Sequence, residues 1–186
     1  LLAPRRGGLA PRQARGRHGQ RTGSSVLVNV VAIILIGAVV RTVFLPKSLR
    51  YDESSTYMNY ASQSLCDVLS DYAAPNNHIF HTVLVHFSTS TFGIYPWTLR
   101  LPAYFAGILV IAATFAVGRR YYGVRVGLIA AAIAAASSWL IEYSVYARGY
   151  SMITLDFLIL LLLAGSLVHR QTTLRWLLFA LFSALG

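Results

Sequence analysis

Two adjacent carboxylates, Asp52 and Glu53, stand in the stretch RYDESSTY at residues 50–57, just after a long apolar run. The chain has only six acidic residues, so a pair at one place is a candidate for acid–base chemistry. Consecutive side chains project in different directions, so these two cannot face each other as the carboxylates of a glycosidase do. Two interpretations stay open: Asp52 caps a helix that begins at Glu53, or it is a general base or a ligand-orienting carboxylate.

A second cluster is APNNHIFH at residues 74–81, where a turn leads into a helix and His78 and His81 share one helix face. As a metal site it is incomplete, because two histidines need a third ligand. As an anion site it is better, since Asn77, His78 and His81 gather at a helix N-terminus, where free backbone N–H groups favour phosphate. Histidines at a membrane surface without any ligand are the remaining alternative.

A third cluster is YSVYARGYS at residues 143–151. Its tyrosines, Tyr150 among them, are also typical of the aromatic belt of a membrane protein. Arg148 lies between two of these tyrosines, and a guanidinium can hold a phosphate through two parallel hydrogen bonds. Snorkelling of Arg148 to the membrane surface without any ligand is the alternative.

Composition indicates what must position these clusters. Of the 186 residues, 56% are hydrophobic and 12% are charged, which indicates an all-α, polytopic membrane protein. The net charge of +10 does not indicate nucleic-acid binding, because six arginines lie in a Gly/Pro-rich tail and most other cations flank apolar runs. The single cysteine, Cys66, excludes an internal disulfide. Because the chain begins with Leu and stops inside an apolar run, we expect an N-terminal fragment.

The apolar runs predict the membrane spans. Residues 1–24 are expected to be a disordered basic tail held in the cytoplasm, with a transit peptide as the weaker alternative. Residues 25–186 are expected to form one transmembrane module, with no broken helix at mid-membrane. Its predicted spans are 26–45, 99–118, 126–146, 151–168 and a truncated one at 174–186.

The positive-inside rule decides how residues 78–93 lie. If this stretch lies flat on the membrane, eleven of the sixteen Lys and Arg residues are cytoplasmic, whereas a crossing would divide them equally. Phe80, Val83, Leu84 and Phe87 recur at helical spacing, as in a helix at a membrane surface. We therefore expect an external loop at 46–96 with two amphipathic surface helices, 53–70 and 78–92.

Four stretches in this order resemble a known family. They are YDE at 51–53, PNNHIFH at 75–81, TFGIYPWTLRLPAYFAGIL at 91–109 and YSVYARGYSM at 143–152. They are similar to the GT-C membrane glycosyltransferases that use polyprenyl-phosphate sugars, the superfamily of the protein O-mannosyltransferases and the lipid A aminoarabinose transferases. The resemblance covers about residues 26–186.

The resemblance implies an inverting transfer of mannose or a similar hexose or pentose from a polyprenyl-phosphate donor to a lipid, glycan or protein hydroxyl. The reaction would occur at the external face of a cytoplasmic or plasma membrane. Asp52 would be the catalytic base and Glu53 a supporting acid, while Arg148 and Tyr150 would hold the donor phosphate. Relatives often carry Pro-Pro or Lys-Pro where this chain has Asn77-His78, which moves the expected phosphate contact to His78 or His81. No cofactor is implied, and dependence on a divalent metal stays open.

Two other functions compete with glycosyl transfer. A transporter or flippase for a lipid-linked anion would use the same phosphate clusters without chemistry, although broken helices and ionisable groups at mid-membrane would then be expected. A membrane scaffold would use the arginine-rich tail to recruit anionic partners, but it would leave Asp52 and Glu53 unexplained.

Overall fold

The computed structural model describes residues 14–70 and 78–185, with side chains from Gly23 on, and every regular element in these ranges is a helix. The elements are α1 (Ala14–Thr42), α2 (Tyr51–Thr56), the π-helical turn η1 (Tyr57–Ala61), α3 (Leu65–Ser70), α4 (Ile79–Phe92), α5 (Pro96–Tyr122), α6 (Val124–Ala136), α7 (Ser138–Ser144), α8 (Tyr150–His169) and α9 (Thr173–Leu185). The protein is therefore an all-α membrane protein, as its composition predicts.

Three of these helices are long and apolar enough to cross a membrane: α1 over Gly23–Thr42, α5 and α8. They correspond to the predicted spans 26–45, 99–118 and 151–168. The predicted span 126–146 is instead a pair of helices, α6 and α7, bent by 63° at a break at Ser137. The described residues contain three candidate spans, or four if this bent pair crosses the membrane as a single span. The shorter α9 lies where the span 174–186 was predicted.

The N-terminal tail can be compared with the prediction only in part, and its disorder stays a prediction. Residues 1–13 lie outside the described residues, but the backbone is already helical from Ala14. Extending an existing helix adds one hydrogen bond for each residue fixed, and Arg, Gln and Ala are good helix formers. The span α1 can therefore continue into the segment that was expected to be disordered.

The break between α6 and α7 contradicts the expectation of unbroken spans, and Arg41 explains how it is tolerated. A helix end leaves backbone carbonyls without partners, which is costly in a membrane. The fully buried guanidinium of Arg41 donates to the carbonyl oxygens of Ala135 at 3.1 Å and Ala134 at 3.3 Å, and to that of Gly37 within α1 at 3.0 Å. Arg41, which appeared in the sequence only as an interruption of a span, thus supplies hydrogen bonds at this break.

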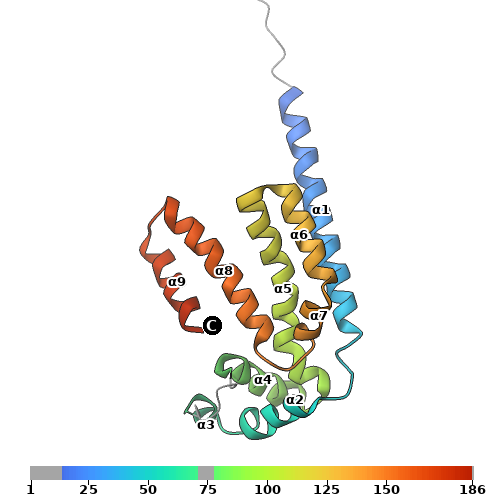
Figure 1. Cartoon of the computed structure of the whole chain (residues 1–186), viewed down its shortest axis with the longest axis vertical. Helices are drawn as coiled ribbons and strands as arrows, with labels where there is room; N and C mark the ends of the chain where they lie inside the picture. Colours follow the sequence, from blue (N-terminus) through green and yellow to red (C-terminus); the bar gives the residue numbers. More distant parts are fainter. Residues whose placement is uncertain (1–13, 71–77, 186) are drawn as a thin grey trace, which may run out of the picture.

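Helix α5 lies between the α1–α6 pair and α8 (Figure 1). Two glycines allow it to approach its neighbours closely. A Cβ added to Gly107 would overlap the side chain of Ser144 in α7, and one added to Gly118 would lie 2.7 Å from the Cα of Gly127 in α6. This close packing places the loop after α7 at a fixed position beside the N-terminal part of α5.

The segments between α1 and α5 gather at one end of the bundle, where α2, α3 and α4 lie across the ends of the long helices (Figure 1). Helix α4 agrees with the predicted surface helix 78–92, and its buried side chains are His81, Thr82, Val85 and Thr89. Phe80 and Phe87 are exposed by 43% and 53%. These two phenylalanines therefore point away from the protein, as expected for a helix whose outer face meets lipid, whereas Val85 is buried.

The other predicted surface helix, 53–70, is not one continuous helix. It is divided into α2, η1 and α3, with a turn after Ala61. Side chains compete with the backbone there: Ser62 Oγ and Gln63 Nε2 both donate to the Met58 carbonyl, at 3.0 and 3.2 Å. The Ala61 carbonyl also pairs with Nδ1 of His86 in α4 at 2.9 Å, which ties the turn to α4.

Candidate functional site

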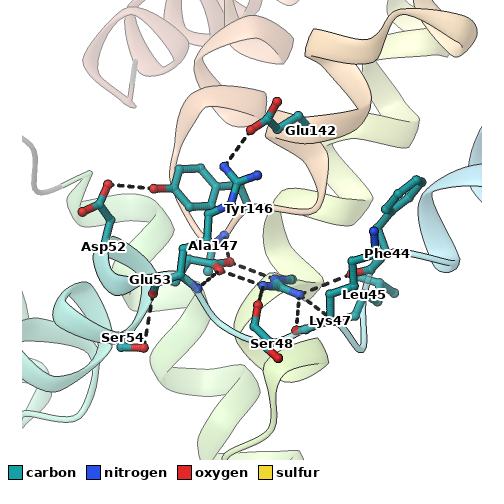
Figure 2. Close-up of polar contacts among 12 residues, drawn as sticks. Phe44, Leu45, Lys47, Ser48, Asp52, Glu53, Ser54, Glu142, Tyr146 and Ala147 are labelled. Carbon is teal, nitrogen blue, oxygen red and sulfur yellow. Dashed lines mark hydrogen bonds and ion pairs between the residues drawn. The ribbon is translucent and has the colours of Figure 1, made fainter.

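Glu53 is the centre of a buried ion pair at the point where α2 meets α5. Its side chain is fully buried, and Arg100 of α5 donates from Nε to Oε1 at 2.8 Å and from Nη2 to Oε2 at 2.7 Å (Figure 2). The backbone N–H groups of Arg50 and Ala147 donate to Oε2 and Oε1, both at 2.8 Å. Four donors therefore fix this carboxylate in place.

These donors keep Glu53 ionised. Burial alone would raise the pKa of Glu53, but the hydrogen bonds from Arg100 and from the backbone N–H groups of Arg50 and Ala147 outweigh burial and hold that pKa below its ordinary value. A carboxylate that is buried, charged and already bonded at both oxygens is poorly suited to exchange protons with a substrate. Its role is to join three segments of the chain.

Arg100 extends this junction to the loop after α1. Its remaining N–H groups donate to four backbone carbonyls, at 2.7–3.3 Å (Figure 2). These carbonyls belong to Phe44, Leu45, Lys47 and Ser48. Arg100 is not among the residues that the sequence motifs indicate, although an arginine inside the apolar stretch TLRLPAYF is a signal that it has a buried partner.

Asp52 has a different environment from its neighbour. It is exposed, and the hydroxyl of Tyr146 donates to its Oδ2 at 2.8 Å (Figure 2). Helix α2 begins at Tyr51 with Arg50 as its N-cap, and Glu53, not Asp52, accepts the Arg50 backbone N–H. The interpretation of Asp52 as a helix cap is therefore wrong, and its carboxylate is available at the surface.

Two side chains contact the ring of Tyr146. Its ring stacks on that of Tyr150, with centroids 6.5 Å apart, and the guanidinium of Arg50 lies 5.1 Å from its centroid. Arg50 in turn donates from Nη1 to Glu142 Oε1 at 2.6 Å, and this hydrogen bond to Glu142 raises the pKa of Arg50. Burial and the hydrogen bond to Asp52 raise the pKa of Tyr146 to about 12, so that its hydroxyl stays protonated at neutral pH.

His78, His81 and Arg148 form a second group of polar atoms. His78 Nε2, His81 Nε2 and Arg148 Nε are buried and have no hydrogen-bond partner among the described residues. Burial, with Arg148 nearby, lowers the pKa of His78; burial, with His78 and Arg148 nearby, lowers that of His81 to about 3. Both histidines are therefore neutral, and the group carries one positive charge.

The segment 146–150 connects the two groups. The hydroxyl of Tyr146 donates a hydrogen bond to Asp52, and the backbone N–H of Ala147 donates one to Glu53. Arg148 Nη1 donates to Thr56 Oγ1 of α2 at 3.3 Å. At its other end, Gly149 and Tyr150 contact His78; the Tyr150 and His78 ring centroids are 5.6 Å apart.

The predicted residues Asp52, Glu53, His78, His81, Arg148 and Tyr150 thus belong to one connected region. Asn77 lies outside the described residues. No three His, Cys, Asp or Glu side chains within the described ranges are grouped so that they could hold a metal ion.

Comparison with known protein families identifies a family for this chain. A family model described as "Dolichyl-phosphate-mannose-protein mannosyltransferase" matches residues 77–186, more than half of the chain. This range includes His78, His81, Arg100 and the whole segment 146–150. No curated protein and no solved structure matches the chain.

Proposed function

Because the chain belongs to the dolichyl-phosphate-mannose-protein mannosyltransferase family, we propose that it transfers a sugar from a polyprenyl-phosphate donor to an acceptor hydroxyl, with Asp52 as the general base. The reaction would invert the anomeric carbon and take place at the membrane face where α2 and α4 lie. The sugar is mannose or a similar hexose or pentose, and the acceptor is a lipid, glycan or protein hydroxyl.

The observation that carries the proposal is the contrast between the two adjacent carboxylates. Glu53 is buried and bonded to four donors, whereas Asp52 is exposed and, within the part of the chain that the structure describes, receives a single donor, Tyr146, on Oδ2. An exposed carboxylate on a helix that is fixed by its neighbour is well placed to accept a proton from a bound hydroxyl.

The polar group of His78, His81 and Arg148 supports the assignment of the donor phosphate. Three buried nitrogen atoms that find no partner among the described residues are costly unless a ligand binds them. Neutral histidines donate from Nε2 in the tautomer that carries the proton there, and Arg148 adds a charge-assisted donor.

Charge favours a monophosphate donor over a diphosphate. The group offers one positive charge, that of Arg148, because both histidines are neutral and the nearby Arg50 is already paired with Glu142. A sugar phosphodiester carries one negative charge, whereas a diphosphate donor carries two and leaves with a larger charge. We therefore infer that a polyprenyl monophosphate is the leaving group.

The mechanism follows from these positions. The acceptor oxygen attacks the anomeric carbon, and its proton passes to Asp52. The bond between the anomeric carbon and the phosphate oxygen breaks, and its electron pair leaves with the polyprenyl phosphate. Arg148, with His78 and His81, stabilises the charge of the leaving phosphate by preorganised donors.

The bent pair α6–α7 is the observation that favours the alternative, a transporter or flippase of a lipid-linked anion, because broken helices often line transport sites. In transporters, however, the freed carbonyls face a substrate or ion. Here Arg41 donates to the carbonyls of Ala134 and Ala135, so the break is filled by the protein itself. We therefore favour glycosyl transfer.

The test uses the whole protein in sealed membrane vesicles with three radiolabelled donors: a polyprenyl monophosphate sugar, a polyprenyl diphosphate sugar and a nucleotide sugar. The proposal predicts that label reaches an acceptor from the monophosphate donor alone. Uptake of the labelled lipid across the vesicle membrane, without any transfer to an acceptor, would support the transporter instead.

A further inference from the structure

Tyr146 is a residue whose contacts exceed those of an interfacial tyrosine, although the sequence indicated for it only a place in an aromatic belt. We propose that Tyr146 is a positioning residue: its hydroxyl holds the Asp52 carboxylate in the orientation that accepts the proton of the acceptor. This inference rests on the proposed function, because it assigns Tyr146 a role only through Asp52.

Two consecutive residues, Tyr146 and Ala147, are hydrogen-bonded to two other consecutive residues, Asp52 and Glu53. Tyr146 donates from its hydroxyl to Asp52 Oδ2, and Ala147 donates from its backbone N–H to Glu53 Oε1, each at 2.8 Å (Figure 2). Two adjacent contacts prevent α2 from sliding or rotating against the segment 146–150. Since Arg148 follows directly, the same pairing sets where the base lies relative to the cation expected to hold the donor phosphate.

The neighbours of the Tyr146 ring restrict its motion. Arg50 covers one part of the ring at 5.1 Å and is itself bound to Glu142, and the Tyr150 ring is nearly parallel to that of Tyr146, with an interplanar angle of 15°. A hydroxyl at the end of such a ring is a preorganised donor. A hydrogen bond of this kind needs no reorganisation when the proton is transferred.

Tyr146 and the acceptor each bring a hydroxyl proton to Asp52, and only the proton of the acceptor is transferred. Tyr146 remains protonated at neutral pH, so its hydroxyl can donate to Asp52 but does not compete with it as a base. Because Tyr146 contacts only Oδ2, Oδ1 of the same carboxylate is the atom that would accept the proton of the acceptor. The two oxygens of Asp52 would thus have separate roles.

The experiment compares Tyr146→Phe with Tyr51→Phe in the whole protein, using the monophosphate donor at saturating acceptor. Tyr51 is the matched control, because it is adjacent to Asp52 and its side chain is 85% exposed. Loss of a hydrogen bond to a charged group corresponds to about a 10- to 100-fold change. We expect Tyr146→Phe to lower kcat by about that factor with no change in the donor KM or unfolding temperature, and Tyr51→Phe to match the wild type.

Other results would overturn the inference. An unchanged kcat for Tyr146→Phe would do so, and so would a raised donor KM at unchanged kcat, which would make Tyr146 a donor-binding residue. Asp52→Asn, measured in parallel, distinguishes a failure of the role of Tyr146 from a failure of the assignment of Asp52 as the general base. If Asp52→Asn is inactive while Tyr146→Phe keeps full kcat, only the inference fails; if Asp52→Asn keeps full activity, the assignment of the general base fails and the inference fails with it.

Discussion

Replacing the two adjacent carboxylates by their amides should separate stability from chemistry. Glu53→Gln should lower the stability of the fold, whereas Asp52→Asn should lower the rate of transfer. Glu53→Gln should destabilise the protein, because it leaves the buried guanidinium of Arg100 without its counter-charge and places an amide N–H₂ group against N–H donors. Asp52→Asn should leave stability nearly unchanged, because Asp52 is exposed and an amide oxygen can still accept the Tyr146 hydrogen bond.

The magnitude follows from burial. Removing one partner of a buried ion pair costs about 3–5 kcal/mol, and that is the loss of unfolding free energy expected for Glu53→Gln. The matched control is Glu142→Gln, which breaks an ion pair of similar length whose side chains are exposed by 58% and 42%. An exposed pair contributes about 0–1 kcal/mol, so the control should remain close to the wild type.

The assay is equilibrium unfolding of the whole protein in detergent micelles, followed by tryptophan fluorescence and by circular dichroism. The expected order of unfolding free energy is wild type, Asp52→Asn and Glu142→Gln together at the top, with Glu53→Gln clearly below. If Glu53→Gln and Glu142→Gln shift the transition equally, the buried pair does not join α2, α5 and the segment 146–150 as we argue.

The pH dependence of the same transition tests the ionisation of Glu53. Its folded-state pKa is held below the ordinary value of 4.5, so its contribution to stability is complete above that pH and is lost as the pH falls through the folded-state pKa. The wild type should therefore lose an extra part of its stability below about pH 4. Glu53→Gln should not show this extra loss, and an identical acid profile for both proteins would contradict the reasoning.

Three further predictions concern the parts that support the site. Arg41→Leu leaves the carbonyls at the α6–α7 break without donors and should cost about 1–3 kcal/mol for each unpaired group, measured by the same unfolding assay. Gly107→Ala places a methyl group against Ser144 and should cost about 1–3 kcal/mol, whereas Gly23→Ala, which meets no atom within 4 Å, should not destabilise the protein. Arg148→Gln should raise the KM for the donor by about 10- to 100-fold, and an unchanged KM would place the phosphate elsewhere.

The parts of the fold that the sequence predicts are those encoded by local patterns. Hydropathy located the spans of α1, α5 and α8, and the spacing of Phe80 and Phe87 predicted the helix α4, on which both phenylalanines are exposed. The break at Ser137 was missed because the Ala-rich stretch before it contains no Pro or Gly. What permits the break is Arg41, far away in the sequence, which no local pattern connects to it.

In the candidate site, too, local patterns predict some features, whereas others depend on residues that are distant in the sequence. The types and order of residues singled out Asp52, Glu53, His78, His81 and Arg148. They did not predict which carboxylate is buried, because that depends on Arg100 and on the backbone N–H of Ala147, which are distant in the sequence from α2. The contact of Tyr146 with Asp52 is likewise set only when the loop after α7 packs against α2.

The most direct test of the proposed base is Asp52→Asn against Asp67→Asn, both exposed aspartates of the segment between α1 and α5. Each protein is assayed in membrane vesicles at matched expression with the labelled polyprenyl monophosphate sugar. A general base contributes about 10²–10⁴ in rate, so we expect Asp52→Asn to lose that factor while Asp67→Asn and the unfolding transitions stay at the wild-type values. Transfer by Asp52→Asn at the wild-type rate would contradict the assignment of Asp52 as the base.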